Sequence, residues 1–274
     1  MKQTIGFIGA GNMATSLIGG LLANHYEATH ITACDIDAQQ LQQLEQRFGI
    51  STSQDAVDCA RTADVVILAV KPQVMRTICE QLAETGARPD QLFISIAAGV
   101  PADAIDGWLG GGRSIVRCMP NTPALLQLGA TGLAANARVT AAQKAAAEHI
   151  LQAVGIAIWV DAEADLDAVT AISGSGPAYF FYFIELLEAA GVKLGLEAKT
   201  AARLARQTAL GAASMALHED VVKLRAQVTS KKGTTEQAIL SFQQNQLARL
   251  VDEATAAAQG RAKQLARELT QDQE

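Results

Sequence analysis

The feature that most constrains this 274-residue chain is a glycine-rich turn that follows an apolar run near its beginning. Ile5–Ile8 has the composition of a buried parallel strand, and the pattern Gly9-x-Gly11-x-x-Ala14 comes directly after it. Gly9 permits a tight turn, Gly11 leaves room for a pyrophosphate beside the backbone, and Ala14 lets the next helix pack closely. The pattern therefore predicts a strand, a phosphate-binding turn and a helix N-terminus, in that order.

An acidic residue stands where a dinucleotide-binding domain needs one. Asp35 follows Ala14 by 21 positions and comes after the next strand-like run, Ile31–Cys34. A carboxylate at that place accepts hydrogen bonds from a ribose 2′-OH. A glycine turn without a ligand is the alternative, but the context favours dinucleotide binding.

Composition excludes several classes of function. The formal net charge is −6 and the chain has no long basic run, which argues against nucleic acid or an anionic membrane as a partner. Its start leads directly into a strand and lacks the apolar core of a signal peptide, and the greasiest segment, Ala178–Ile184, is too short to span a bilayer. The four cysteines form no CxxC pair, so we expect reduced thiols in a cytoplasmic protein rather than a zinc site or a redox pair.

The first 160 residues alternate between two kinds of pattern, which predicts a doubly wound, mostly parallel α/β sheet of the Rossmann type over residues 1–160. The expected strands are Thr4–Ile8, His30–Cys34, Asp64–Val70, Gln91–Ile96, Ser114–Met119, Thr131–Ala134 and Gly155–Val160. The expected helices are Met13–Asn24, Ala38–Phe48, Gln54–Arg61, Gln73–Glu84, Ala102–Leu109 and Ala141–Val154.

Residues 161–274 contain no strand pattern and are expected to form an all-helical domain for dimerisation and substrate binding. The helix Pro177–Ala190 is apolar almost all round until Glu185, so we expect it to be buried in a bundle or between subunits. Because so short a helical domain carries so much apolar surface, the sequence predicts burial against a second copy. The other expected helices are Asp165–Ile172, Glu197–His218, Val221–Val228, Thr234–Phe242 and Leu247–Leu269.

Three more loops of the first half are expected at the edge of the sheet where ligands bind. Ala69–Pro72 follows one predicted strand, and its Lys71 can contact a ribose, a phosphate or the substrate, or remain a solvated surface lysine. Ala97–Gly99 is small enough to admit a flat ring. Asn121, in Met119–Pro123, offers a donor and an acceptor, although a rigid structural turn explains this loop as well.

Two hydroxyl-bearing loops stand out in the second half. Ser173–Pro177 opens an apolar helix, with Ser175 as the expected cap, and free N–H groups at a helix start can hold a carboxylate. Val228–Thr235 combines hydroxyls, two lysines and a glycine, which can bind an anionic substrate and donate a hydrogen bond. For both segments a plain capping loop is the alternative interpretation.

No other cluster of side chains points to chemistry of its own. The four histidines are scattered, and neither metal-ligand spacing nor clustered carboxylates occur, so we expect no metal. The chemistry is therefore expected to belong to a bound cofactor.

With these loops identified, the chain resembles the pyrroline-5-carboxylate reductase family along nearly its full length. The resemblance is carried by GFIGAGNMA at 6–14, AVKP at 69–72, SIAAGV at 95–100, RCMPNTPA at 117–124, AVTAISGSGPAY at 168–179 and LRAQVTSKKGTTEQAI at 224–239. It implies NAD(P)H-dependent reduction of 1-pyrroline-5-carboxylate to proline, the last step of proline synthesis. It also implies an interlocked homodimer, often assembled further into a decamer.

The resemblance also implies roles for particular residues. The residues that it places at the cofactor, NADP or NAD, are Gly9, Ala10, Gly11, Asn12, Met13, Ala69, Val70, Lys71, Pro72, Ala97, Ala98, Gly99 and Asn121. Asp35 is expected at the cofactor because of its spacing after the glycine turn. Those expected to frame the substrate are Ser175, Gly176, Ser230, Gly233, Thr234 and Thr235. Thr235 matches the hydroxyl proposed to bond the ring nitrogen, and is the expected catalytic residue.

The sequence departs from the family pattern at two places. Lys232 replaces a family glycine in the loop usually written SPGGTT, which costs roughly 1 kcal/mol if the position needs φ > 0; we expect activity to survive and the lysines to tighten carboxylate binding. After the second strand the family often carries basic or small polar residues, whereas this chain has Cys34-Asp35-Ile36-Asp37. We therefore expect NADH to be used at least as well as the family pattern suggests.

Two other functions fit parts of the pattern. A related imine or β-hydroxyacid reductase would share both domains, but β-hydroxyacid enzymes place a catalytic lysine on a helix of the second domain, whereas the loop Thr229–Thr235 suits an imine better. A dinucleotide sensor without catalysis would keep the fold alone.

Overall fold

The computed structural model describes residues 3–84 and 87–271 and divides into two compact units. The first, called the sheet unit here, comprises residues 1–175 and 258–274. The second, the helical unit, comprises residues 176–257. The division falls within the last helix, α12 (Leu247–Gln271).

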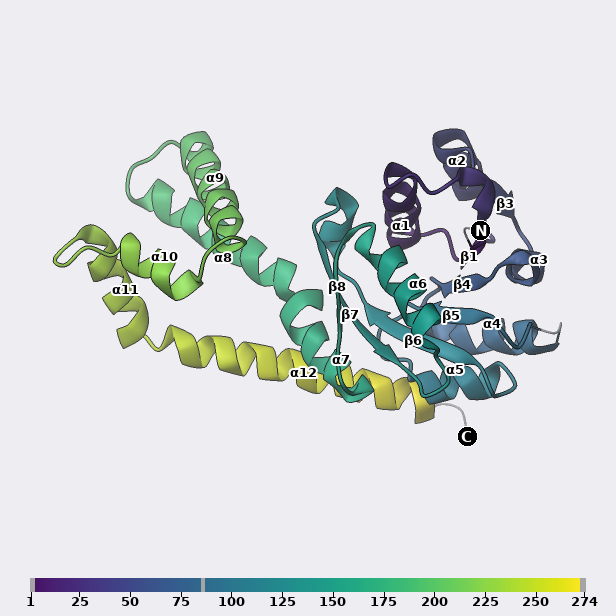
Figure 1. The fold of residues 1–274 in the computed structure, drawn as a ribbon. Helices are drawn as coiled ribbons and strands as arrows, with labels where there is room; N and C mark the ends of the chain where they lie inside the picture. The colour runs from purple at the N-terminus through teal and green to yellow at the C-terminus, as the bar shows by residue number, and fades with distance from the viewer. Residues whose placement is uncertain (1–2, 85–86, 272–274) are drawn as a thin grey trace. The chain divides into compact units, whose positions relative to one another are not determined.

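The sheet unit is built on one eight-stranded sheet of order β3-β2-β1-β4-β5-β6-β7-β8 (Figure 1). All neighbouring pairs are parallel except β6 and β7. The order reverses between β1 and β4, which creates the switch point where doubly wound sheets bind ligands. The strands are β1 (Ile5–Ile8), β2 (Ile31–Cys34), β3 (Ser51–Ser53), β4 (Val65–Leu68), β5 (Leu92–Ser95), β6 (Ser114–Met119), β7 (Gly129–Ala135) and β8 (Gly155–Trp159).

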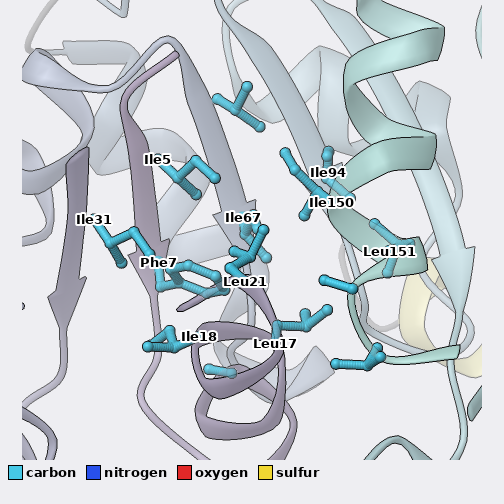
Figure 2. Packing of buried hydrophobic residues seen from close by; sticks show 14 of the residues in the cluster. Ile5, Phe7, Leu17, Ile18, Leu21, Ile31, Ile67, Ile94, Ile150 and Leu151 are labelled. Carbon is cyan, nitrogen blue, oxygen red and sulfur yellow. The ribbon is translucent and has the colours of Figure 1, made fainter. Parts of the chain in front are cut away.

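Helices cover both faces of this sheet. Alternate residues of a strand point to opposite faces, and in β1 the side chains of Ile5 and Phe7 join one core while Ile8 joins the other. The first core is closed by α1 (Asn12–Ala23), α2 (Ala38–Phe48) and α6 (Ala141–Gln152); Figure 2 shows Phe7 and Ile67 beside Leu21 of α1. The second is closed by α3 (Ala56–Thr62), α4 (Pro72–Glu84) and α5 (Ala102–Trp108), with Leu269 of α12 packed against it.

Short helical segments complete the sheet unit. They are the 3₁₀ turns η1 (Ala28–His30), η2 (Thr122–Leu126) and η3 (Glu163–Asp165), the single turn α7 (Leu166–Val169) and the π-helical turn η4 (Thr170–Gly174). The predicted doubly wound class is confirmed. The edge strand β3 was not predicted, because Ser51–Ser53 is polar and only three residues long.

The helical unit contains no strand among its residues. Its helices are α8 (Gly176–Lys193), α9 (Ala198–Ala216), α10 (Val221–Gln227), α11 (Thr234–Gln244) and the first part of α12. Small residues bring α8 and α9 together, because a Cβ added to Gly191 would lie 2.9 Å from the Cβ of Ala201. The expectation of extra apolar surface is met: Phe180 is 70% exposed and Phe181 is 65% exposed in this single chain.

Candidate functional site

The turn after β1 has the shape that its glycines predict. Gly9 has φ +103°, and a Cβ there would lie 2.6 Å from the carbonyl oxygen of Ala69, so a side chain is excluded both by backbone geometry and by space. The Gly9 N–H donates to the carbonyl of Cys34 at 2.8 Å. This turn is therefore pinned between the ends of β2 and β4, at the switch point of the sheet.

Gly11 has the opposite surroundings. A Cβ added there would meet no atom within 4 Å, and the residue is exposed. It is the N-cap of α1, whose first turn has neither a side-chain cap nor an acidic residue. Open space, uncapped N–H groups and the positive end of a helix dipole together fit the pyrophosphate of a dinucleotide.

Side chains from the next turn hold Ala10 on both sides. Asp35 Oδ2 accepts a hydrogen bond from the Ala10 N–H at 2.7 Å, and Gln40 Nε2 donates to the Ala10 carbonyl at 2.9 Å. The other oxygen of Asp35 accepts from the Asp37 N–H at 3.0 Å. Asp35 thus braces the glycine turn, and Gln40 is a positioning residue that the sequence pattern did not reveal.

Two further predicted loops lie at the same edge of the sheet. In the loop after β4, Ala69 is packed against Gly9, Lys71 is exposed, and Pro72 begins α4. In the loop after β5, Ala97 is buried and Ala98 is exposed. Because β1, β4 and β5 are parallel neighbours, their following loops are brought together.

Gly99, the last residue of that second loop, is covered by the end of α12. A Cβ on Gly99 would lie 3.2 Å from Leu269 Cδ1, and its φ of +79° also favours glycine. The C-terminal part of α12 therefore shapes this loop, which no local sequence pattern indicated.

Asn121 is 8% exposed, and both polar atoms of its side chain form hydrogen bonds with the backbone of the fold. Its Oδ1 accepts from the Ala130 N–H at 2.9 Å, and its Nδ2 donates to the Ser173 carbonyl at 3.0 Å. In this structure Asn121 ties the end of β6 to the start of β7 and to the π-helical turn. Its predicted contact with the cofactor stays a prediction.

Strand β6 contributes an arginine to an ion pair that the sequence did not predict. Arg117 Nη1 lies 2.6 Å from Glu163 Oε1, and the same oxygen accepts from the Ala102 N–H at 2.8 Å. The pair fixes the start of α5, directly after the Ala97–Val100 loop. Arg117 Nε is buried and has no hydrogen-bond partner among the described residues.

The segment around Ser175 differs from its prediction. Ser175 has helical dihedral angles (φ −86°, ψ −22°) and its N–H donates to the Thr170 carbonyl at 2.8 Å, so it is not an N-cap. Gly174 is fixed against the end of β6, since a Cβ there would lie 2.6 Å from Met119 Cε. The predicted loop Ser173–Pro177 is therefore helical on both sides of Ser175: Ser173 and Gly174 end a π-helical turn, and Gly176 begins α8. A π-helical turn often accompanies a functional site.

The helical unit presents the second candidate group. The Gly233 N–H donates to the Ser230 carbonyl at 2.9 Å, closing a turn in which Lys232 has φ +62°. A Cβ on Gly233 would lie 2.4 Å from Ser230 Oγ, and Gly233 is the N-cap of α11 without a side-chain cap. Ser230 and Thr234 are exposed and Thr235 is half-buried.

Lys232 holds the strained conformation anticipated for it. Its N–H donates to Glu236 Oε2 at 2.6 Å, a contact that fixes the turn from the first turn of α11. A left-handed non-glycine residue costs about 1 kcal/mol, and this hydrogen bond offsets part of that cost.

The described residues include neither a cluster of metal ligands nor an exposed thiol. Within residues 3–84 and 87–271 no three His, Cys, Asp or Glu side chains gather as metal ligands, and no helix is long and apolar enough to cross a membrane. Burial raises the thiol pKa of Cys59, Cys79 and Cys118 to about 12, which leaves them unreactive. All four cysteines are free.

A groove of about 480 Å³ lies along β8, away from the glycine turn. Ile158, Trp159, Val169 and Ile172 line it, and the buried hydroxyl of Thr131, which also lines it, has no partner in the described part of the chain. Ile158 and Ile172 are exposed, so this edge of the sheet unit is apolar as well.

Comparison with known proteins gives a consistent result along the whole chain. Residues 163–265 match the family model described as "Pyrroline-5-carboxylate reductase dimerisation". Residues 4–99 match a second family model, described as "NADP oxidoreductase coenzyme F420-dependent". A pyrroline-5-carboxylate reductase of Pseudomonas aeruginosa is 53% identical over 97% of this chain and 98% of its own length.

Solved structures agree. The pyrroline-5-carboxylate reductase of Coxiella burnetii superposes with a TM-score of 0.93 at 45% identity, covering 97% of this chain and 99% of that one. The enzyme of Plasmodium falciparum, solved with NADP bound, gives a TM-score of 0.83 at 29% identity, covering 97% and 98%.

Proposed function

Because the chain belongs to the pyrroline-5-carboxylate reductase family, we propose that it reduces 1-pyrroline-5-carboxylate to proline with a reduced nicotinamide dinucleotide. The observation that carries this function is the open cradle at Gly11, in a chain related to those reductases along its full length. A cofactor with a pyrophosphate fits that cradle, because the space beside Gly11 is open and the N–H groups at the start of α1 have no side-chain cap.

The cofactor half of the site lies in the sheet unit. Gly9–Met13 hold the pyrophosphate through backbone N–H groups at the start of α1, and Asp35 keeps that turn in shape. Ala69–Pro72 and Ala97–Gly99 flank it, and Asn121 fixes the neighbouring backbone. When bound, the reduced nicotinamide supplies a hydride for the imine carbon.

The substrate half uses Ser175 and Gly176 together with the turn Ser230–Thr235. The uncapped N–H groups at the start of α11 suit a carboxylate, which sets the distance and face of the substrate ring. Lys231 and Lys232 add positive charge to the same turn. The hydroxyl of Thr235 donates a hydrogen bond to the ring nitrogen, which draws electrons from the C=N bond and makes the imine carbon more electrophilic.

The functional assembly is a homodimer at least, and the family resemblance extends this to a decamer. Exposed Phe180 and Phe181 on α8, with exposed Leu204 and Leu210 on α9, support burial against a second copy. A functional division near residue 160 gives each copy a dinucleotide-binding part, residues 1–160, and a dimerisation part, residues 161–274. Four free, buried thiols support a cytoplasmic location.

A spectrophotometric assay tests this function. Oxidation of NADH or NADPH is followed on adding 1-pyrroline-5-carboxylate, and proline is quantified in the same mixture. We expect one proline for each cofactor oxidised. Oxidation with a β-ketoacid instead identifies a β-hydroxyacid enzyme, and binding of cofactor without oxidation identifies a sensor.

A further inference from the structure

Three carboxylates surround the turn that leaves β2, and we call Asp35, Asp37 and Asp55 the acidic corner. It lies beside the glycine turn, because Asp35 is bonded to Ala10. In a sheet of this order, the end of β2 lies near the ribose that carries the 2′-substituent of a bound dinucleotide. The inference below therefore rests on the proposed function, and concerns which dinucleotide is chosen.

Asp35 cannot readily turn away from this position. Its two oxygens accept from the N–H groups of Ala10 and Asp37, at 2.7 and 3.0 Å. Each carboxylate oxygen keeps a further lone pair, so Asp35 can accept from a ribose hydroxyl while staying in place. A 2′-phosphate would instead meet a fixed negative charge.

Asp37 closes the other place where a phosphate could bind. Its Oδ1 accepts from the N–H groups of Gln39 and Gln40, at 2.9 and 3.2 Å, and so caps α2. Free N–H groups at a helix start attract phosphate. Here the protein's own carboxylate already occupies them and adds a second negative charge.

Asp55 brings a third carboxylate from the neighbouring strand. β2 and β3 are parallel, with Cys34 opposite Ser53, so the turns that follow them are adjacent. The pKa of the Cys34 thiol is raised to about 11 by burial first and then by Asp35 and Asp55. Asp35 and Asp55 therefore both lie close enough to the Cys34 sulfur to raise its pKa.

The chain segments that form the acidic corner contain no basic residue that could balance these charges. Residues 33–46 and 51–60 contain no Lys or Arg. The next arginines along the chain are engaged elsewhere: Arg47 lies over the Phe48 ring at 4.7 Å, and Arg61 lies 3.5 Å from Asp58. Ile36, between the first two carboxylates, is 92% exposed and has an apolar side chain.

We propose that the acidic corner makes NADH the preferred cofactor of this chain by excluding the 2′-phosphate of NADPH, with Asp37 as the specificity-determining residue and Asp35 as both a ribose acceptor and a brace of the glycine turn. Charge repulsion of this kind disfavours NADPH by about tenfold or more at low ionic strength. The preference shrinks as salt rises, because exposed charges are screened.

Binding titrations of the full-length protein with NADH and NADPH, without substrate, test the proposal directly. Asp37→Ser keeps a good helix cap while removing the charge, so it should tighten NADPH binding several-fold and leave NADH binding unchanged. Adding Ile36→Arg should reverse the preference. Asp35→Asn should weaken both cofactors, since it disturbs the brace on Ala10. Asp90→Ser is the matched control, because it removes one charge two residues before β5, at the opposite end of the parallel strands.

Each outcome decides the matter. Wild-type protein that binds NADPH as tightly as NADH overturns the proposal, as does an Asp37→Ser variant whose ratio of affinities is unchanged. A ratio that does not respond to salt contradicts the electrostatic cause. If NADH is preferred but 1-pyrroline-5-carboxylate is not reduced, the proposed function fails and the cofactor preference stands.

Discussion

The two units differ in how completely a single chain buries their apolar side chains. In the sheet unit, apolar strands are buried on both faces, and the backbone of the glycine turn is held by Asp35 and Gln40. In the helical unit, α8 buries only Gly176 fully while large aromatic side chains remain in solvent. A single copy therefore buries the core of the sheet unit by itself, whereas the helical unit leaves apolar side chains that we expect a partner to cover.

We expect the largest effect from a charged residue on the exposed face of α8, because it tests whether the helical unit needs a partner. Phe180→Asp places a carboxylate in a surface expected to be buried in the oligomer, so we expect monomers and loss of nearly all reductase activity. Light scattering after size-exclusion chromatography reports the mass, and NADH titration reports the sheet unit, which should still bind. Ala145→Asp on α6 is the control. An active Phe180→Asp oligomer would contradict this division of labour.

Removing the hydroxyl of Thr235 should affect the reaction without affecting cofactor affinity. We expect Thr235→Ala to lower kcat by about 100-fold, the size typical of a lost proton or hydrogen-bond donor, and Thr235→Ser to keep most of the rate. NADH binding should not change in either variant. Equal rates for the alanine and serine variants would remove Thr235 from catalysis.

Two alanine variants in the glycine turn should have different effects, one on the stability of the fold and the other on cofactor binding. Gly9→Ala forces a Cβ against the Ala69 carbonyl at a positive φ, and should destabilise the chain by about 3 kcal/mol in urea unfolding. Gly11→Ala meets no atom, so stability should stay within about 0.5 kcal/mol while NADH binding weakens roughly tenfold. Equal losses of stability would show that the cradle at Gly11 is not open.

The buried cysteines should make the stability of the sheet unit, but not of the helical unit, depend on pH. All four lie in the sheet unit, and burial raises the pKa of Cys59, Cys79 and Cys118 to about 12. Their contribution to stability is complete below the unfolded thiol pKa of about 8.5 and is lost as pH rises toward 12, because only the unfolded chain releases protons there. The free energy of unfolding should fall from pH 9 upward. Iodoacetamide at pH 8 should label the unfolded chain only; rapid labelling of folded protein would contradict this burial.

The smallest effect is expected at Lys232. Lys232→Gly relieves the left-handed backbone and should stabilise the chain by about 1 kcal/mol. Replacing Lys231 with Pro and Lys232 with Gly should raise the KM for the imine about two- to threefold, since the carboxylate loses nearby positive charge. A KM that is unchanged or lower would show that the lysines do not help to bind substrate.

Much of this architecture could be predicted, because local patterns determine it. Apolar runs such as Val65–Leu68 mark the central strands, and the glycine spacing marks the turn after β1. The positive φ at Lys232 followed from the glycine that the family carries there. The tail of α12 against Gly99, the brace from Gln40 and the internal role of Asn121 are contacts between distant residues, which no local pattern encodes. The π-helical turn Thr170–Gly174 was predicted only in part. Its first three residues lie in the expected helix Asp165–Ile172, whereas Ser173 and Gly174 were interpreted as loop because glycine and serine favour both.

Deuterium tracing tests the central claim most directly. Wild-type protein is given 1-pyrroline-5-carboxylate and NADH labelled with deuterium on the transferring face of its nicotinamide, and the proline formed is examined by mass spectrometry and NMR. The account predicts one deuterium at C5 of proline for each cofactor oxidised, with the rate of proline formation lowered about tenfold in Gly11→Ala at low cofactor concentration. Proline without label, or cofactor oxidised without proline, would contradict it.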